Sequence, residues 1–279
     1  MFIIFLTIFA IASVFGADYE TRTHRLEVPE DPGKWVYKGN DSDHSHGRGG
    51  GRISGGQTAT DTQFPWVARL GINLQNGGSL ASGSLIKSNW IVSARHALIN
   101  PNGVFVAVSV QAQLGSADDQ KFRVKIFCNS FVWMNVNIGE APDIALFRLT
   151  NDLALNSYVN VVRLPSRAQA NFKFEGYTIT AIGWGGDNTG LPAKKLQWTT
   201  FKVLYERDCY LRPNMICSES TGQSSLQGGD SGGPSVIYEN GTPTLVGINV
   251  IGVGKRFGST RVSDFLNFIS DSTGLQIRN

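Results

Sequence analysis

The sequence predicts an all-β protein with a single helix at its C-terminal end. It contains 32 glycines and 10 prolines among 279 residues, and these residue types mark many turns. Between the turns, segments in which apolar and polar residues alternate recur at residues 104–113, 122–127, 177–184 and 244–251. Such alternation is typical of β-strands. Many short strands with one terminal helix favour antiparallel sandwiches or barrels.

The expected helix lies near the end of the chain. Val262, Phe265, Leu266 and Ile269 recur at the three- and four-residue spacing of one helix face, and Ser263 is a suitable N-cap. A polar stretch at residues 165–173 is a candidate connection between two halves of the remaining chain.

The first 15 residues are almost entirely apolar, which indicates a secretory signal peptide. The run is too short to span a bilayer comfortably, and small residues at Val14 and Gly16 precede a suitable cleavage point. We therefore expect residues 1–16 to be a signal peptide. The mature protein would then be secreted and extracellular, and would contain no membrane span. A buried N-terminal helix is the alternative.

The following segment, residues 17–52, differs from the rest because it is polar and ends in a glycine-rich charged tract. A stretch with few apolar residues cannot bury enough surface to offset the entropy of ordering it. We expect it to be exposed and open to proteases. His44 and His46 suggest a metal site, but histidines in such a tract are more often solvated.

Charge and cysteine content exclude some classes of function. The formal net charge is +3, and no Lys/Arg run forms a stripe that would follow a phosphate backbone, so we expect no nucleic-acid partner. Cys209 and Cys217 are close enough in sequence for one local disulfide. Cys128 is then left over, either buried as a small apolar residue or free.

Two features suggest nucleophilic catalysis. Of the four histidines, only His96 follows Arg52, and it stands where a loop begins after the apolar run of residues 90–94. Residues 228–234 read GGDSGGP. Glycines on both sides of Ser231 permit unusual backbone conformations and leave N–H groups free to face a developing negative charge. A lone structural histidine and a plain glycine-rich turn are the respective alternatives.

The third feature is Asp143, which opens the apolar segment 144–146. A carboxylate in such a place loses hydration unless a donor compensates it. An imidazole N–H is one such donor, and an Asp–His pair would orient the ring to take a proton from a serine.

Four motifs in order resemble the trypsin/chymotrypsin-like serine proteases. They are residues 53–56 (ISGG), 93–96 (SARH), 143–146 (DIAL) and 229–234 (GDSGGP). Asp143 follows His96 by 47 residues, and Ser231 follows Asp143 by 88, which matches the order and spacing of the family. Residues 183–185 (GWG) and 260–262 (TRV) extend the likeness, which covers essentially all of residues 53–279.

The resemblance implies two packed six-stranded antiparallel β-barrels with a C-terminal helix, in a protease domain of residues 53–279. It implies that Ser231 is the nucleophile, His96 the general base and Asp143 the residue that orients the imidazole. Gly229 and Ser231 would supply the N–H groups of an oxyanion hole. The implied partners are protein or peptide substrates and protein protease inhibitors, and no cofactor or metal is needed.

The resemblance also explains the polar segment as an activation propeptide, residues 17–52. Cleavage between Arg52 and Ile53 by a trypsin-like protease would free the Ile53 amine to pair with Asp230 and complete the oxyanion hole. The protein would then be a zymogen.

The sequence departs from the family pattern around the active site. Ala97 and Ala81 stand where the family usually has a disulfide, which removes a cross-link worth roughly 2–4 kcal/mol. Arg95 replaces a small residue beside His96 and would disturb it if its stem could not reach solvent.

The segments that border the specificity pocket are altered too. The resemblance places the pocket at Ser225 (or Ser224), Val250, Ile251 and Gly252, with Phe257 close by. None of these residues is acidic, so we expect a preference for apolar or aromatic side chains rather than Lys or Arg.

Two other functions are consistent with these patterns. A weak or inactive homologue acting as a binding or regulatory protein would explain the altered pocket and Arg95. An unrelated secreted β-barrel binder would make the four ordered motifs coincidental.

Overall fold

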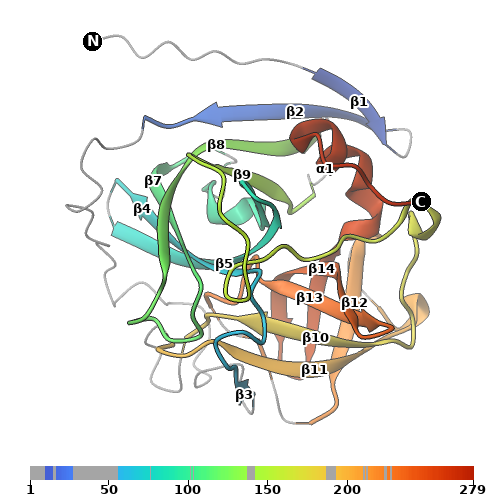
Figure 1. Cartoon of the computed structure of the whole chain (residues 1–279). Coiled ribbons are helices and arrows are strands. Elements are labelled where there is room, and N and C mark those ends of the chain that lie inside the picture. The colour runs from blue at the N-terminus through green and yellow to red at the C-terminus, as the bar shows by residue number, and fades with distance from the viewer. Residues whose placement is uncertain are drawn as a thin grey trace.

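The computed structural model contains two closed antiparallel β-barrels and a short C-terminal helix, as predicted (Figure 1). The structure describes residues 10–14, 17–27, 56–75, 77–100, 102, 104–136, 142–186, 193–209, 211, 213–222, 225–226 and 228–279. Arg52, Ile53 and the His44/His46 pair lie outside these residues. Among the described residues, no helix is long and apolar enough to cross a membrane.

The first barrel is closed by six strands in the order β8-β7-β4-β5-β6-β9, with β9 returning to pair with β8. Strand β6 is buried along its whole length and β9 is buried except at Arg148, because both lie in the interior of the molecule. The bounds are β4 (Val67–Leu74), β5 (Gly77–Lys87), β6 (Trp90–Ser93), β7 (Ala107–Leu114), β8 (Val124–Val136) and β9 (Ala145–Leu149).

The second barrel closes in the order β10-β13-β14-β15-β12-β11, with β11 returning to β10, and the two-residue strand β3 pairs with β11. Phe174, Phe201 and Phe257 fill its interior. The bounds are β3 (Gln57–Thr58), β10 (Thr178–Gly183), β11 (Gln197–Val203), β12 (Met215–Ser220), β13 (Pro234–Glu239), β14 (Thr242–Val253) and β15 (Arg256–Arg261).

The helix begins later than its sequence pattern suggests, and Ser263 does not cap it. A 3-10 turn, Val262–Phe265, precedes the helix α1 (Leu266–Thr273). The Ser263 hydroxyl donates instead to the carbonyl oxygen of Phe172, because Ser263 is fully buried against the segment that connects the barrels. Leu266, Phe268 and Ile269 join a core cluster that includes residues of both barrels.

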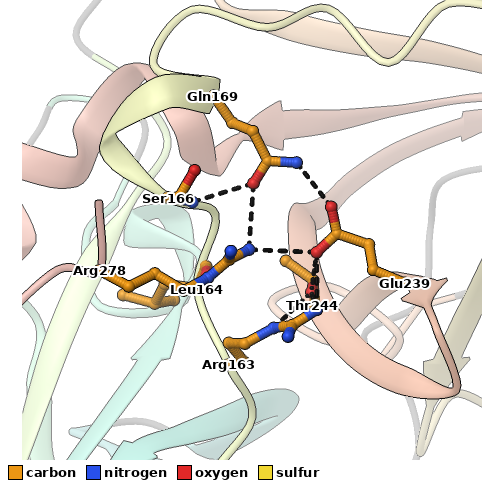
Figure 2. A network of polar contacts seen from close by, with 7 residues as sticks. All are labelled: Arg163, Leu164, Ser166, Gln169, Glu239, Thr244 and Arg278. Atoms are coloured by element: carbon orange, nitrogen blue, oxygen red, sulfur yellow. Dashed lines mark hydrogen bonds and ion pairs between the residues drawn. The ribbon is translucent and has the colours of Figure 1, made fainter.

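One polar network fastens the connection between the barrels, which contains the stretch 165–173 predicted for that role. Its centre is Glu239, at the end of β13 (Figure 2). Glu239 accepts hydrogen bonds from Arg163 at 2.6 Å, Gln169 at 2.6 Å, Thr244 at 2.8 Å and Arg278 at 3.1 Å. The connection, the β13–β14 hairpin and the C-terminal tail therefore meet at one carboxylate.

The charge of Glu239 is stabilised by these partners. Burial raises the pKa of its carboxyl, but the hydrogen bonds from Thr244 and Gln169 and the charges of Arg163 and Arg278 lower it overall. Folding therefore favours the ionised form, and the network weakens only as the pH falls through this lowered pKa.

Two further strands come from the N-terminal segment. Strand β1 (Ala10–Val14) lies within the predicted signal peptide, and β2 (Ala17–Arg25) lies in the predicted propeptide. Strand β2 pairs with β8, so the expectation that all of residues 17–52 would be exposed is wrong for β2. Backbone pairing with an existing strand orders this polar segment although it has few apolar side chains of its own.

Candidate active site

The site begins where β6 ends. The buried strand ends at Ser93, and the chain then forms a 3-10 turn, Arg95–Ala97, that carries His96. Because the turn leaves the barrel interior, the His96 side chain is 44% exposed.

Asp143 reaches the same place from the neighbouring strand. Strands β6 and β9 are antiparallel, with Ser93 opposite Ala145. His96 follows Ser93 by three residues and Asp143 precedes Ala145 by two, so the pairing alone brings the two side chains to one end of the strand pair. In the sequence these residues are 47 positions apart.

The two residues form a two-point contact. The backbone N–H of His96 donates to Asp143 Oδ1 at 2.9 Å, and His96 Nδ1 lies 2.6 Å from Asp143 Oδ2. The carboxylate therefore fixes both the backbone and the ring of His96, and favours the tautomer that carries its proton on Nδ1. From the second barrel, the Thr260 hydroxyl donates to the carbonyl oxygen of Asp143 at 2.9 Å.

Burial and charge shift both pKa values. Burial lowers the pKa of His96, but the hydrogen bond and the negative charge of Asp143 raise it overall above its ordinary value. Burial raises the pKa of Asp143, whereas the hydrogen bonds from His96 and its charge lower it overall. The positive charge of Arg95 lowers the pKa of both residues. The His96–Asp143 contact forms despite Arg95.

Ser231 lies in a tight loop that is pressed against the first barrel. Gly232 has φ = +81°, and a Cβ atom built there would stand 2.0 Å from Ser93 Oγ and 2.4 Å from the carbonyl oxygen of Ser82. No residue with a side chain fits this position. The glycine thus places Ser231 next to the strand that leads to His96. Among the described residues, the Ser231 hydroxyl makes no hydrogen bond.

A residue that the sequence did not single out, Ser82, joins this loop to the first barrel. Its N–H donates to the carbonyl oxygen of Ser231 at 2.8 Å, and its hydroxyl donates to that of Gly229 at 2.9 Å. The same hydroxyl accepts the Trp184 N–H at 2.9 Å. Ser82 is fully buried, and a polar residue at a buried strand position is the signal that would have marked it.

Asp230, the predicted partner of a new N-terminus, is completely buried. Its Oδ1 accepts the Gly185 N–H at 2.9 Å. A Cβ at Gly183 would lie 2.2 Å from that oxygen, and one at Gly185 would lie 2.6 Å from the carboxylate. The glycines of the Gly-Trp-Gly motif are therefore needed to make room for this carboxylate.

A cavity of about 270 Å³ opens beside Ser231. Of the predicted pocket residues, Val250, Ile251 and Gly252 line it, whereas Ser225 does not. Asn249, which precedes Val250 in the segment that the resemblance assigns to the pocket wall, lines the cavity too, whereas the sequence did not identify Leu226 as a lining residue. The lining consists of Leu226, Gly228, Asp230, Ser231, Asn249, Val250, Ile251 and Gly252.

Two residues near this cavity, Asn249 and Phe257, are fixed by contacts inside the second barrel. Asn249 is fully buried, its Oδ1 accepts the Ser235 hydroxyl at 2.7 Å, and its carbonyl oxygen accepts the Gly232 N–H at 2.7 Å. Phe257 does not enter the cavity, because it packs edge-on against Phe201 inside the second barrel, with ring centroids 4.2 Å apart.

The cysteines complete the description of the candidate residues. Cys209 and Cys217 form a disulfide, and Cys128 is a buried free thiol whose pKa is raised by burial. Among the described residues, no group of three or more His, Cys, Asp or Glu side chains has the arrangement of a metal site.

Comparison with known proteins decides the family. The family model described as Trypsin matches residues 53–269. The chain belongs to the trypsin family. This protease is 31% identical to serine protease 1 of Drosophila melanogaster over 245 residues, which cover 81% of this chain and 87% of the relative.

Other relatives agree with this assignment. The protease is 30% identical to a collagenase of Hypoderma lineatum over 239 residues, which cover 81% of this chain and 88% of that protein. A solved HL collagenase structure matches with a TM-score of 0.68 and 29% identity, over 80% of this chain and 99% of the other. The protein is therefore a serine-type endopeptidase, as the sequence predicted.

The hydrogen bonds of Ser82 predict a specific defect. In Ser82→Ala, the part-buried Gly229 carbonyl oxygen and the buried Trp184 backbone N–H lose this partner, which costs about 1–3 kcal/mol. Because Gly229 belongs to the loop that carries the candidate nucleophile Ser231, we expect kcat to fall about tenfold or more with little change in KM, measured on a chromogenic peptide.

Ser79→Ala, on the same strand, is the matched control and should retain the kcat of the parent protease. A kcat for Ser82→Ala equal to that of the parent would contradict the positioning role of Ser82.

Proposed function

We propose that this protease is a secreted zymogen that hydrolyses peptide bonds through His96, Asp143 and Ser231. The observation that carries the proposal is the two-point contact between His96 and Asp143. It holds the imidazole with its proton on Nδ1, so the other ring nitrogen is left to accept a proton. The glycine-rich loop that carries Ser231 packs against β5 and against β6, the strand that leads to His96.

The chemistry follows from these positions. Ser231 attacks the peptide carbonyl carbon while His96 removes the hydroxyl proton and later gives it to the leaving amine. Asp143 stabilises the imidazolium that forms, since its lowered pKa keeps it ionised. The N–H groups of Gly229 and Ser231 are the proposed donors to the oxyanion.

Activation is the second part of the proposal. A signal peptide of residues 1–16 is removed on secretion, and a trypsin-like protease cuts between Arg52 and Ile53. The new Ile53 amine then pairs with Asp230. The burial of that carboxylate supports this step, because a buried aspartate requires compensating donors or a positive charge. Protein protease inhibitors are the proposed regulators.

Covalent labelling tests the triad. The secreted protein, cut before Ile53, should react with a fluorophosphonate at Ser231, as located by mass spectrometry of the adduct. Labelling and peptidase activity should both fall by about 10⁴-fold in His96→Ala and in Asp143→Asn.

The control for this experiment is Asp152→Asn, which alters an exposed aspartate on a surface loop and should leave labelling unchanged. A correctly cut and folded protein that is never labelled would instead be an inactive homologue.

Arg95 predicts a change in pH dependence. Activity requires a neutral His96 imidazole, so kcat/KM falls as the pH drops through its pKa. Arg95 lowers that pKa, and Arg95→Ala removes this effect. The acid limb of the kcat/KM profile should therefore move to higher pH in Arg95→Ala, and stay in place in Arg95→Lys, which retains the charge. A shift of the acid limb to lower pH in Arg95→Ala would contradict the inference that the charge of Arg95 lowers the pKa of His96.

We further propose that the cavity beside Ser231 accepts apolar or aromatic side chains. Leu226, Val250 and Ile251 contribute apolar side chains to its lining, and the one carboxylate among its described lining residues, Asp230, is fully buried and bound to Gly185. Among these described residues, a charged substrate side chain would find no exposed partner of opposite charge.

A library of peptide substrates tests this preference by ranking the residue before the cleaved bond. Gly252→Val should lower kcat/KM about tenfold or more for aromatic residues and much less for alanine, because a Cβ there stands only 3.2 Å from the Leu226 carbonyl oxygen. A strong preference for Lys or Arg would overturn the assignment.

A further inference from the structure

Strand β8 is longer than its neighbours β7 and β9, so part of one edge of β8 can pair with a further strand. Its first part pairs with β7, up to Cys128 opposite Val110. Its last part pairs with β9, at Ser130 to Trp133. Beyond the end of β7, the edge of β8 that does not pair with β9 is occupied by β2 (Figure 1). This pairing runs from Tyr19 opposite Val136 to Arg25 opposite Ser130.

Side chains add to this backbone pairing. The His24 ring stacks on Phe105 with centroids 3.9 Å apart, and Phe105 stacks in turn on Trp133 at 5.8 Å. Burial lowers the pKa of His24, so the neutral ring is favoured in this stack. Past the end of β2, the Leu26 N–H donates to the Asn129 carbonyl oxygen at 3.0 Å, and Leu26 packs against the main core.

The paired segment touches both parts of the chain that flank the site. Phe105 lies nine residues after His96 and forms a β-bridge with Ile99. Strand β8 ends at Val136, seven residues before Asp143. Residues 17–27 therefore rest on the segment that follows the catalytic histidine and on the strand that leads towards the aspartate.

We propose that residues 17–27 stay bound to the active protease as a non-covalent second chain after cleavage at Arg52. All three cysteines of the chain lie after Ile53, so no disulfide can retain the fragment. Strand addition to the edge of β8, the His24–Phe105 stack and the Leu26 contacts hold it instead. The inference rests on the proposed cut, and it gives the propeptide a role after activation.

Removal of the signal peptide does not disturb this attachment. Strand β1 pairs with residues 17–21 of β2, on the edge opposite to β8. Cleavage after Gly16 therefore removes β1 and leaves the whole β2–β8 register in place.

The pairing predicts which amides of β2 matter. Amides along an antiparallel strand face alternate sides, and the Leu26 amide faces β8. The amides of His24 and Arg22 therefore also face β8, whereas the Thr23 amide faces away. Proline at residue 22 removes a ladder donor, and proline at residue 23 does not.

The experiment uses the full secreted chain with residues 48–52 replaced by Asp-Asp-Asp-Asp-Lys, so that enteropeptidase cuts before Ile53. The cut protein is passed through a size-exclusion column at neutral pH, and mass spectrometry quantifies the N-terminal fragment in the protease peak. We expect the fragment to co-elute in the parent, in Arg22→Ala and in Thr23→Pro. In Arg22→Pro it should fall about tenfold or more.

Two results would overturn the inference: loss of the fragment from the parent protease, or equal retention in Arg22→Pro and Thr23→Pro. Peptidase activity is measured on the same samples. An inactive protein that keeps its fragment contradicts the proposed activation and not the strand pairing, so the two failures are distinguishable.

Discussion

The structure depends on one close approach, in which the loop that carries Ser231 is pressed against strands β5 and β6 of the other barrel. At Gly232 there is no room for a Cβ atom between Ser93 and Ser82. Across this contact the Ser82 N–H and hydroxyl donate to the carbonyl oxygens of Ser231 and Gly229. Within the first barrel, the Ser93 hydroxyl donates to the Ser82 carbonyl oxygen at 2.8 Å. Because leaving buried polar groups unpaired is costly, these bonds favour the observed docking of the two barrels.

The same contact governs how the three candidate catalytic residues are placed relative to one another. His96 and Asp143 are brought together inside the first barrel by the antiparallel pairing of β6 and β9. Ser231 comes from the second barrel, and its position relative to them depends on how the barrels dock. Ser82 belongs to the first barrel and bonds to the loop of the second barrel that carries Ser231, so it connects the barrel of His96 and Asp143 to that loop.

The protease has one disulfide, and hydrogen-bonded clusters take over some of the cross-linking. Ser82 occupies the position next to Ala81, where the resemblance led us to expect a lost cross-link. Glu239 joins three chain segments behind the barrels (Figure 2). Hydrogen bonds to charged groups contribute about 1.5–3 kcal/mol each where they are buried, and less where solvent screens them, as it does at the partly exposed side chains of Arg163, Glu239 and Arg278.

Alternating residues predicted strands β7, β8, β10 and β14, but local patterns failed where long-range contacts intervene. Residues 122–127 and 244–251 lie within or overlap longer strands, because pairing with partners extends β8 and β14 beyond their alternating segments. Ser263 has the residue type of a helix cap, yet its hydroxyl bonds to Phe172. The polar composition of β2 gave no sign of its pairing, because strand addition uses backbone groups that every sequence possesses.

The sequence by itself predicted the family, the reaction class and the candidate nucleophile, general base and orienting carboxylate, because glycine, serine, histidine and aspartate in this order and spacing are typical of that chemistry. Only the tertiary structure decided that Leu226 rather than Ser225 lines the cavity, that Ser82 supports the loop that carries Ser231 and that residues 17–25 join the first barrel. The physical reason is that lining, support and strand addition depend on which surfaces meet in space, and residues far apart in the chain contribute those surfaces.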